Sequence, residues 1–347
     1  MFDDLRTERL LLRRAQPDDV DAMVERRNDP EVTRLQNWTL PFTRETAQEH
    51  LANAVATPGP VDERWWMATV VLADAGQPDT GQIVGEIVVH PTNGTRTAEV
   101  GYTFARQFWG RGYAVEALTA MTDWLFTNLP VTRLHAGLHP DNRASAMLLE
   151  RTGFLFEGHP RLSFWLGDDN SDDWIYGMTR ADWQAWRSRP RTAPDQVELV
   201  EIDAENAHAV RSLRTHHSQQ AFVAPVVDSF ADALFPEAVD GAPLVPFLRA
   251  VLADGELVGF VMVAEPTQTH PEPYLWRLLI DRMHQRRGIG GRVVDLVRAQ
   301  CRSWEATGLL VSWREGRGSP RPFYLARGFV PTGELVDGET MARLTLG

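Results

Sequence analysis

The chain has 347 residues, of which 43% are hydrophobic and 24% are charged, and its formal net charge is −12 at pH 7. This length suits two domains that each bury a core of their own, and the acidic balance disfavours nucleic acid as a partner. No apolar run approaches the 18 or so residues that a membrane helix needs. The single cysteine, Cys301, excludes an internal disulfide, and with no signal-peptide pattern at the N-terminus we expect a cytoplasmic protein.

The beginning of the chain has the pattern of one strand followed by two helices. The strand covers residues 8–14, and Pro17 then opens a helix that extends to about residue 28. A second helix covers 44–56, with Thr43 as its N-cap. The segment 30–41 between the helices has no regular pattern, so we expect it to be irregular.

Alternating strands and helices fill the rest of the first half. Three strand patterns separated by short turns predict an antiparallel meander. A glycine-rich turn, a helix, a strand and a further helix ending at Gly153 come next. The expected strands are 65–72, 82–90, 98–104, 132–138 and 174–179, and the expected helices are 114–128 and 142–152.

The glycine-rich turn reads Gln107-Phe-Trp-Gly-Arg-Gly-Tyr-Ala114. Strand, glycine-rich turn and helix form the arrangement that presents free backbone N–H groups to a phosphate. Gly110 and Gly112 can adopt backbone conformations that other residues rarely take, and Arg111 adds positive charge. A turn of this kind is also common as simple punctuation between elements, so alone it does not establish a site.

The second half begins after an exposed, proline-containing linker at 188–196. It contains the turn Gln285-Arg286-Arg287-Gly288-Ile289-Gly290, which has the same Gln-x-x-Gly-x-Gly spacing 178 residues after Gln107. A repeat at about half of the chain length indicates two copies of one domain. We expect strands at 198–202, 247–252, 257–264 and 274–280, and helices at 204–213 and 291–304.

The two turns resemble the acetyl-CoA pyrophosphate loop of the GCN5-related N-acetyltransferase (GNAT) superfamily. Neither turn has the Gly-Lys-Ser/Thr ending of a Walker A loop. The resemblance implies an α/β (α+β) fold with two tandem domains, 1–187 and 197–347, each a mixed, mostly antiparallel sheet with helices on both faces. It implies acetyl-CoA between two splayed strands, bound in the first domain by Tyr102, Thr103, Phe104, Gln107, Gly110, Arg111, Gly112, Tyr113 and Ala114. In the second domain it implies binding by Leu279, Ile280, Gln285, Arg286, Arg287, Gly288, Ile289 and Gly290.

The first half resembles the RimJ/RimL-like branch of that superfamily. The resemblance rests on the opening Thr7–Arg13 and on the segment 139–154, with its Asn-x-x-Ser and Gly-Phe pattern. It implies that Asn142 holds the pantetheine arm and that Ser145 protonates the departing thiolate. The alternative is that both residues only cap a helix. Leu149 stands where many members of the superfamily have a catalytic tyrosine.

The second half resembles the bacterial diamine/spermidine N-acetyltransferases. The matching residues are Phe222–Pro225, Leu278–Asp281, the Gln285 turn and 318–329. Tyr324 takes the position of the tyrosine general acid, and its alternative role is packing on the sheet. Arg317 departs from the asparagine that many members have.

The sequence does not single out one residue as the general base. Glu99 is the candidate in the first half, Asp281 and Glu315 are the candidates in the second, and a chain of water molecules could serve instead. The spacing of His135 and His139 with acidic residues does not suggest a metal site, and we expect no metal.

These features predict an N-acetyltransferase that moves an acetyl group directly from acetyl-CoA to a primary amine. The acceptor could be a protein N-terminus, a polyamine, an aminoglycoside-like antibiotic or another small amine. Two alternatives remain: one domain is degenerate and only binds acetyl-CoA or has a structural role, or the donor is a longer acyl-CoA. We expect a monomer or a homodimer.

Overall fold

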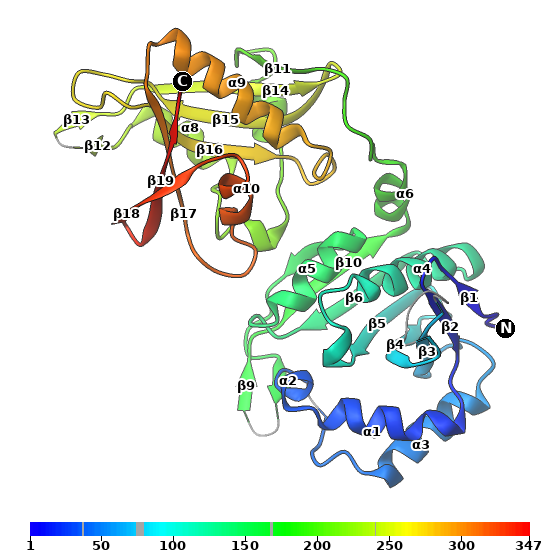
Figure 1. The fold of residues 1–347 in the computed structure, drawn as a ribbon. Helices are drawn as coiled ribbons and strands as arrows, with labels where there is room; N and C mark the ends of the chain where they lie inside the picture. The colour runs from blue at the N-terminus through cyan, green and yellow to red at the C-terminus, as the bar shows by residue number, and fades with distance from the viewer. Residues whose placement is uncertain (37, 74–79, 167–168, 240) are drawn as a thin grey trace. The chain divides into compact units, whose positions relative to one another are not determined.

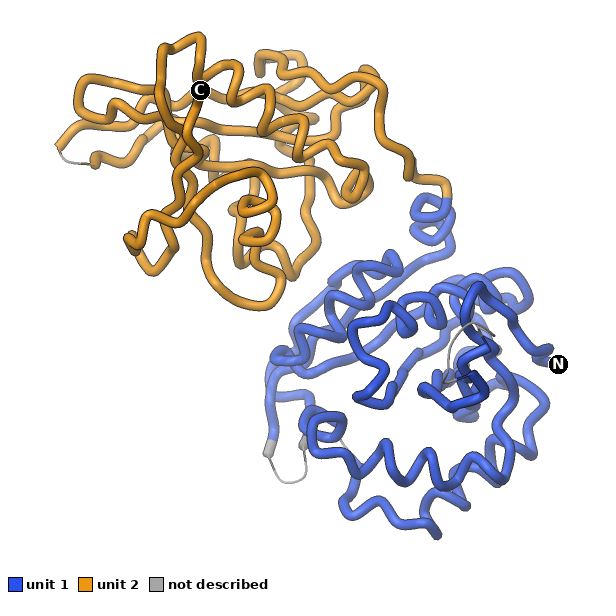
Figure 2. Tube along the Cα trace, viewed as in Figure 1, with its two compact units in different colours: residues 1–187 blue, residues 188–347 orange. Residues whose placement is uncertain are grey.

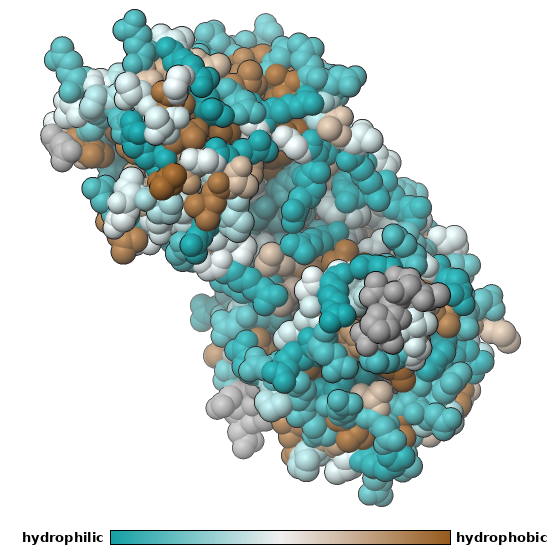
Figure 3. Space-filling view, in the orientation of Figure 1, coloured by the Kyte–Doolittle hydropathy of each residue, from teal (hydrophilic) through white to brown (hydrophobic). Residues whose placement is uncertain are grey.

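The computed structural model describes residues 1–36, 38–73, 80–166, 169–239 and 241–347. The chain divides into two compact units, Met1–Arg187 and Ser188–Gly347 (Figure 2). Each unit has one large sheet and its own hydrophobic cores. The face shown in Figure 3 is mainly hydrophilic, in keeping with the charged composition.

The first unit is built on an eight-stranded sheet in the order β1-β2-β3-β4-β5-β6-β10-β7. All neighbouring pairs are antiparallel except β5 and β6, which are parallel. A separate hairpin joins β8 (Phe164–Leu166) and β9 (Asp169–Ser171). The strands of the sheet are β1 Leu5–Arg6, β2 Leu10–Arg14, β3 Trp66–Leu72, β4 Ile83–Thr92, β5 Thr97–Phe104, β6 Arg133–Leu138, β7 Leu155–Gly158 and β10 Trp174–Thr179.

Helices cover both faces of this sheet (Figure 1). The larger core lies under α4 (Tyr113–Asn128) and α5 (Arg143–Thr152), where their apolar side chains meet the sheet. On the other face, α1 (Val20–Asn28) and α3 (Arg44–Ala56) form a smaller core against β3 and β4. The unit also has the 3-10 turn η1 (Pro17–Asp19), the short helix α2 (Pro30–Thr33) and α6 (Arg180–Ser188).

The second unit repeats this plan with a seven-stranded sheet in the order β11-β14-β15-β16-β17-β19-β18. Only β16 and β17 are parallel. One core packs against α9 and α10, and another packs against α7 and α8. The bounds are β11 Val197–Val200, α7 Ala207–Arg211, η3 His217–Gln219, α8 Val226–Leu234, β12 Ala238–Val239, β13 Ala242–Pro243, β14 Pro246–Ala253, β15 Glu256–Ala264, β16 Tyr274–Ile280, α9 Ile289–Ser303, β17 Gly308–Trp313, α10 Arg321–Leu325, β18 Val330–Val336 and β19 Glu339–Thr345.

The predicted mixed, mostly antiparallel sheets with helices are confirmed, but two local predictions were wrong. The segment 30–41 is not wholly irregular, because Asp29 accepts a hydrogen bond from the Glu31 N–H and caps α2. The helix expected at 204–213 is only α7. The Asp203 carboxylate binds the N–H groups of Glu205 and Asn206 and delays the start of the helix.

Cys301 is fully buried, and burial raises the pKa of its thiol to about 12, as expected of a structural cysteine. Among the residues that the structure describes, no group of three or more His, Cys, Asp or Glu residues is arranged to hold a metal ion. Within the same described ranges, no helix is both long enough and apolar enough to cross a membrane.

Candidate active site

The central strands of the first unit separate after a short paired stretch. Thr97–Glu99 on β5 pair with Arg133–His135 on β6, and the described pairing of the two strands stops there. Further along, β5 pairs only with β4, and β6 pairs only with β10. On the side that faces β6, the backbone of Val100–Phe104 therefore forms no hydrogen bonds with a described strand, and it borders the gap between the two strands.

The second unit opens in the same way. Tyr274 and Leu275 on β16 pair with Leu310 and Val311 on β17, and the described pairing then ends. A shift of register between Met262 and Val263 on β15 falls opposite Trp276, just where β16 leaves β17. Such an irregularity bends and twists a strand, which helps to open the gap.

The glycine-rich turn of the first unit leads from the open end of β5 into α4. Gly110 and Gly112 have φ values of 76° and 82°, and Gly112 is the N-cap of α4. The first helical bond runs from the Glu116 N–H to the Gly112 carbonyl, so the N–H groups of Tyr113–Val115 precede the helical ladder. A Cβ on Gly110 would meet no atom within 4 Å, which leaves space for a ligand beside these donors.

The turn of the second unit corrects the predicted repeat distance. Gly288, with a φ of 77°, is the N-cap of α9, and Arg286 two residues earlier has a φ of 66°. Gly112 therefore matches Gly288, and Gly110 matches Arg286. The repeat distance is thus two residues shorter than the Gln107–Gln285 spacing indicated. Gly290, which the sequence pattern matched to Gly112, lies inside α9.

Trp109 is the residue that matches Gln285. The Trp109 indole Nε1 donates to the carbonyl of Phe104, the last residue of β5, at 2.8 Å. The Gln285 Nε2 donates to the carbonyl of Ile280, the last residue of β16, at 3.0 Å. Gln107 instead lies on the 3-10 turn η2 (Arg106–Phe108), where it is exposed and lines a small pocket that includes residues of α1.

The arginines of the two turns have different surroundings. Arg106 forms an ion pair with Asp29 at 3.0 Å, and Arg111 lies over the ring of Phe108. Arg287 is buried, donates to the Thr192 carbonyl at 2.8 Å and lies 3.1 Å from His284 Nδ1. Any phosphate contact at position 287 would therefore come from the main chain.

The structure brings Ser145 and Tyr102 together. The Tyr102 hydroxyl lies 2.6 Å from Ser145 Oγ, and Asn142 caps α5 by accepting the Ser145 N–H at 3.2 Å. Burial raises the pKa of Tyr102, and the bond to Ser145 offsets only part of that effect. Tyr102 was expected only as a cofactor contact, because nothing in the sequence links two residues 43 positions apart.

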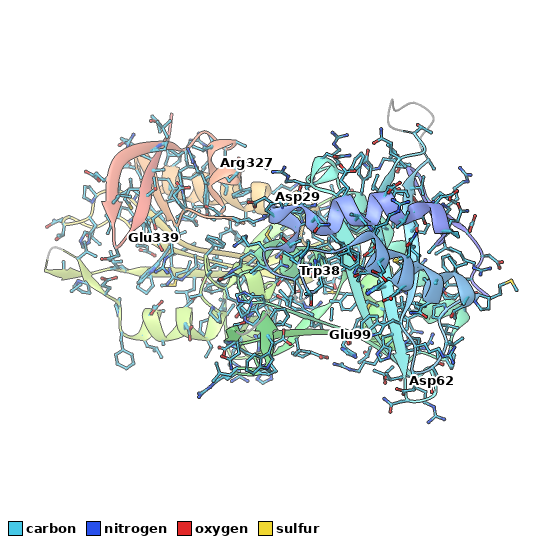
Figure 4. All side chains as sticks on the ribbon, turned by 90° about the horizontal axis from the view of Figure 1, so that it is seen from below. Asp29, Trp38, Asp62, Glu99, Arg327 and Glu339 are labelled. Atoms are coloured by element: carbon cyan, nitrogen blue, oxygen red, sulfur yellow. The ribbon has the colours of Figure 1, made fainter. Side chains whose placement is uncertain are left out.

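Glu99 lies on the opposite face of the sheet from this pair. Strand β5 alternates regularly, so Tyr102 shares the α4 and α5 face with Ala98 and Val100, while Glu99 faces the other way. Figure 4 marks Glu99 among the side chains of the first unit. Glu99 is flanked by His90 on β4 and His135 on β6. Burial lowers the pKa of His135, although the nearby Glu99 carboxylate opposes that shift.

In the second unit, Tyr324 is buried on α10. Its ring stacks on Trp313 at 5.9 Å and contacts Phe329 edge-on at 5.4 Å, and burial raises its pKa. The hydrogen bonds of the described residues include none from its hydroxyl. Asp281 accepts the N–H groups of Arg214 and Met283. Glu315 accepts from the Trp313 indole. Both carboxylates thus have structural partners.

Comparison with known proteins identifies two family matches along the chain. Residues 9–155 match the acetyltransferase (GNAT) domain, and residues 201–329 match the acetyltransferase (GNAT) family. Uncharacterized N-acetyltransferase p20 of Bacillus licheniformis is 31% identical over 160 residues, which cover 45% of this chain and 85% of that protein. The [ribosomal protein uS5]-alanine N-acetyltransferase of Escherichia coli is 29% identical over 114 residues, 32% of this chain and 58% of that enzyme.

Solved structures are also similar to about half of the chain. A GNAT-family acetyltransferase from Bacillus anthracis has a TM-score of 0.44 and 25% identity, and covers 51% of this chain and 98% of its own. The ribosomal L7/L12 alpha-N-protein acetyltransferase RimL, solved with coenzyme A, has a TM-score of 0.44 and 18% identity, and covers 51% and 98%.

A mixed sheet that opens between two parallel strands beside a glycine-capped helix, present twice, defines a tandem acyltransferase fold. The chain belongs to the GNAT family of N-acetyltransferases. Its N-terminal half resembles RimJ/RimL-like enzymes, and the acetyl donor that the family implies is acetyl-CoA.

Proposed function

We propose that the first unit transfers an acetyl group from acetyl-CoA directly to a primary amine, with a protein N-terminus as the leading acceptor class. The observation that carries the proposal is the gap between β5 and β6. It lies beside a glycine-capped helix, with the Ser145–Tyr102 pair on one face of the sheet and Glu99 on the other.

The residues around this gap fit the donor. The N–H groups at the start of α4, with the open space at Gly110, suit a diphosphate. On the side of the gap, the backbone of Val100–Thr103 pairs with no described strand, which suits the amide groups of a pantetheine arm, and the family resemblance adds Asn142 as a further contact. When bound, acetyl-CoA supplies an acetyl group activated as a thioester.

Proton movements divide between the two faces. An amine such as that of lysine has a pKa of about 10.4, so the acceptor must lose a proton before it attacks. Glu99 takes that proton, and His135 beside it can pass it on because burial lowers its pKa and keeps it neutral near pH 7. The C–N bond forms as the C–S bond breaks. Ser145 gives its proton to the sulfur as it takes one from the hydrogen-bonded Tyr102 hydroxyl, and the proton that left the amine returns to Tyr102 through water.

The acceptor proposal rests on a named relative. The Escherichia coli relative acts, by its name, on an alanine of ribosomal protein uS5, which makes exposed N-terminal amines the first acceptors to test. Small amines, including the polyamines suggested by the resemblance of the second half, form the next class. Both classes of acceptor are available in the cytoplasm, where we propose that the protein acts.

The second unit is either a second active site or an acetyl-CoA-binding module. Tyr324 and the Gly288 loop favour activity. Two observations favour a binding or structural role: Tyr324 is buried against Trp313, and the Arg287 side chain is hydrogen-bonded to the Thr192 carbonyl. A substitution of Tyr324 separates the two, because Tyr324→Phe would reduce turnover only if the second unit is catalytic.

The test is a turnover screen of the full chain with acetyl-CoA and three acceptor sets. These are peptides with free N-termini, the same peptides with blocked N-termini, and polyamines. We expect thiol release and a mass increase of one acetyl group with free N-termini, and loss of about 100-fold in rate for Ser145→Ala. Stoichiometric binding of acetyl-CoA without thiol release for every acceptor would contradict the proposal.

A further inference from the structure

The segment just before β2 holds the first turn of α4. Three donors converge on the Glu116 carboxylate: Thr7 Oγ1 at 2.6 Å, the Arg9 N–H at 2.8 Å and Arg9 Nε at 2.7 Å. Partial burial alone would raise the pKa of Glu116, but the hydrogen bonds from Thr7 and Arg9 outweigh it and lower that pKa. Glu116 is therefore an ionised, fully engaged carboxylate at the helix start.

Arg9 also reaches the glycine-rich turn itself. Its Nη1 donates to the Arg111 carbonyl at 2.9 Å, and its guanidinium lies over the Tyr113 ring at 4.7 Å. A Cβ on Gly112 would lie 3.4 Å from Arg9 Nη2. One side chain thus contacts Arg111 and Tyr113, on either side of Gly112.

In the second unit, the positions that match Arg111 and Glu116 are held by hydrogen bonds from arginine side chains to backbone carbonyls. Arg287 and Arg292 match Arg111 and Glu116 when the helix N-caps are aligned. Arg287 donates to the Thr192 carbonyl at 2.8 Å, and Arg292 donates to the Asp195 carbonyl at 3.0 Å. Thr192 and Asp195 precede β11, the strand that matches β2 at this side of the sheet. In each unit, the segment before that strand fixes the same two positions of the turn and helix.

We propose that Thr7 and Arg9 are positioning residues that hold the glycine-rich turn in the shape that binds the diphosphate of the donor. The proposal rests on acetyl-CoA being the donor of the first unit. An unpaired Glu116 carboxylate in the first turn of α4 would repel a diphosphate, and Arg9 cancels that charge. A turn already held in place also loses less conformational freedom when the ligand binds.

The test is titration calorimetry of coenzyme A into the full chain carrying Gly288→Trp, so that only the first turn can bind. We expect Arg9→Met to weaken binding about tenfold, as the loss of charge-assisted hydrogen bonds predicts. Thr7→Val should weaken it several-fold, and Thr7→Ser, which keeps the hydroxyl, should leave it close to that of the parent. In turnover, Arg9→Met should raise KM for acetyl-CoA and leave kcat unchanged.

The matched control is Arg13→Met. Arg13 lies in the same opening motif and forms a two-pronged ion pair with Asp19, at 2.9 and 2.6 Å, without touching the turn. It should lower Tm without changing the dissociation constant.

The positioning role of Thr7 and Arg9, called the clamp below, is wrong if Arg9→Met and Thr7→Val bind coenzyme A as tightly as the parent. It is also wrong if Arg13→Met weakens binding as much as they do. A parent chain that binds no coenzyme A would instead overturn the donor proposal and the clamp together. If Arg9→Met does not fold, the Thr7 variants still test the positioning role. Equal binding of coenzyme A by Thr7→Val and Thr7→Ser would contradict it.

Discussion

At the scale of single residues, the hydrogen bond between Tyr102 and Ser145 defines the proposed proton donor. Leu149 stands where many members of the superfamily have a tyrosine, yet the structure places a tyrosine hydroxyl beside Ser145 from another element, β5. Burial raises the pKa of Tyr102, so the phenol stays protonated at neutral pH and can donate to Ser145.

We predict that Tyr102→Phe lowers kcat about tenfold and leaves KM for acetyl-CoA unchanged, because the substitution removes the group that orients Ser145. The double variant with Ser145→Ala should be no slower than Ser145→Ala alone, since the two residues act as one unit. Steady-state kinetics with the acceptor identified in the screen measures both effects. Fully additive losses would show that Tyr102 does not act through Ser145.

The chain offers a matched control for this substitution. Tyr176 is also a buried tyrosine of the same sheet, and its hydroxyl donates to Glu150 on α5 at 3.1 Å. Tyr176→Phe should change stability and leave kcat alone. A similar loss of kcat in both variants would point to a general disturbance of α5.

Motifs in the sequence predicted some residues of the site but not the contacts between them. Asn142 and Ser145 were predicted from motif positions, and Glu99 from its place at the strand before the glycine-rich turn. The structure places Ser145 beside Tyr102, and Glu99 on the other face of the sheet. Their chemical roles stay predictions. The Tyr102–Ser145 contact depends on how α5 packs over β5, and no local pattern in the sequence records that packing.

At the scale of elements, Trp109 and Gln285 close the ends of β5 and β16 with the same hydrogen bond to the last carbonyl of the strand. We predict that Trp109→Phe, which keeps an aromatic ring without a donor, loosens the turn by about 1 kcal/mol. Trp109→Gln should restore the bond. Hydrogen exchange of a peptide covering 104–114 should be about fivefold faster in Trp109→Phe than in the parent. Equal exchange in the Phe and Gln variants would contradict this role.

Most elements could be predicted because their signals are local. The helix α3 begins and ends where the sequence indicated, and Thr43 caps it by accepting the Thr46 N–H at 3.1 Å. The strand β16 also matches its predicted range. The predicted repeat distance was wrong because the Gln-x-x-Gly-x-Gly sequences of the two turns align best at an offset two residues from the structural match. The left-handed N-caps Gly112 and Gly288, and the strand-end hydrogen bonds of Trp109 and Gln285, reveal the correct alignment.

At the scale of the whole molecule, the chain consists of two GNAT domains whose central strands open in the same manner. In both domains the pairing of the two parallel strands ends at the start of the gap, a glycine is the N-cap of the next helix, and a side chain is hydrogen-bonded to the last carbonyl of the strand. These shared features indicate that each domain retains the form of a donor site. The domains differ in the residues around the gap, since the first has the Ser145–Tyr102 pair and the second has Tyr324 in an aromatic stack. We infer that donor binding is common to both domains, whereas catalysis depends on each one's own side chains.

Titration calorimetry of acetyl-CoA into the full chain and into its Gly112→Trp and Gly288→Trp variants tests directly whether each domain binds the donor. Both glycines have a positive φ, so a tryptophan at either position strains the turn and fills the space beside the helix N-terminus. Our prediction is two molecules of acetyl-CoA per chain and the loss of one by each substitution. No binding to the unsubstituted chain, or binding that neither substitution affects, would contradict it.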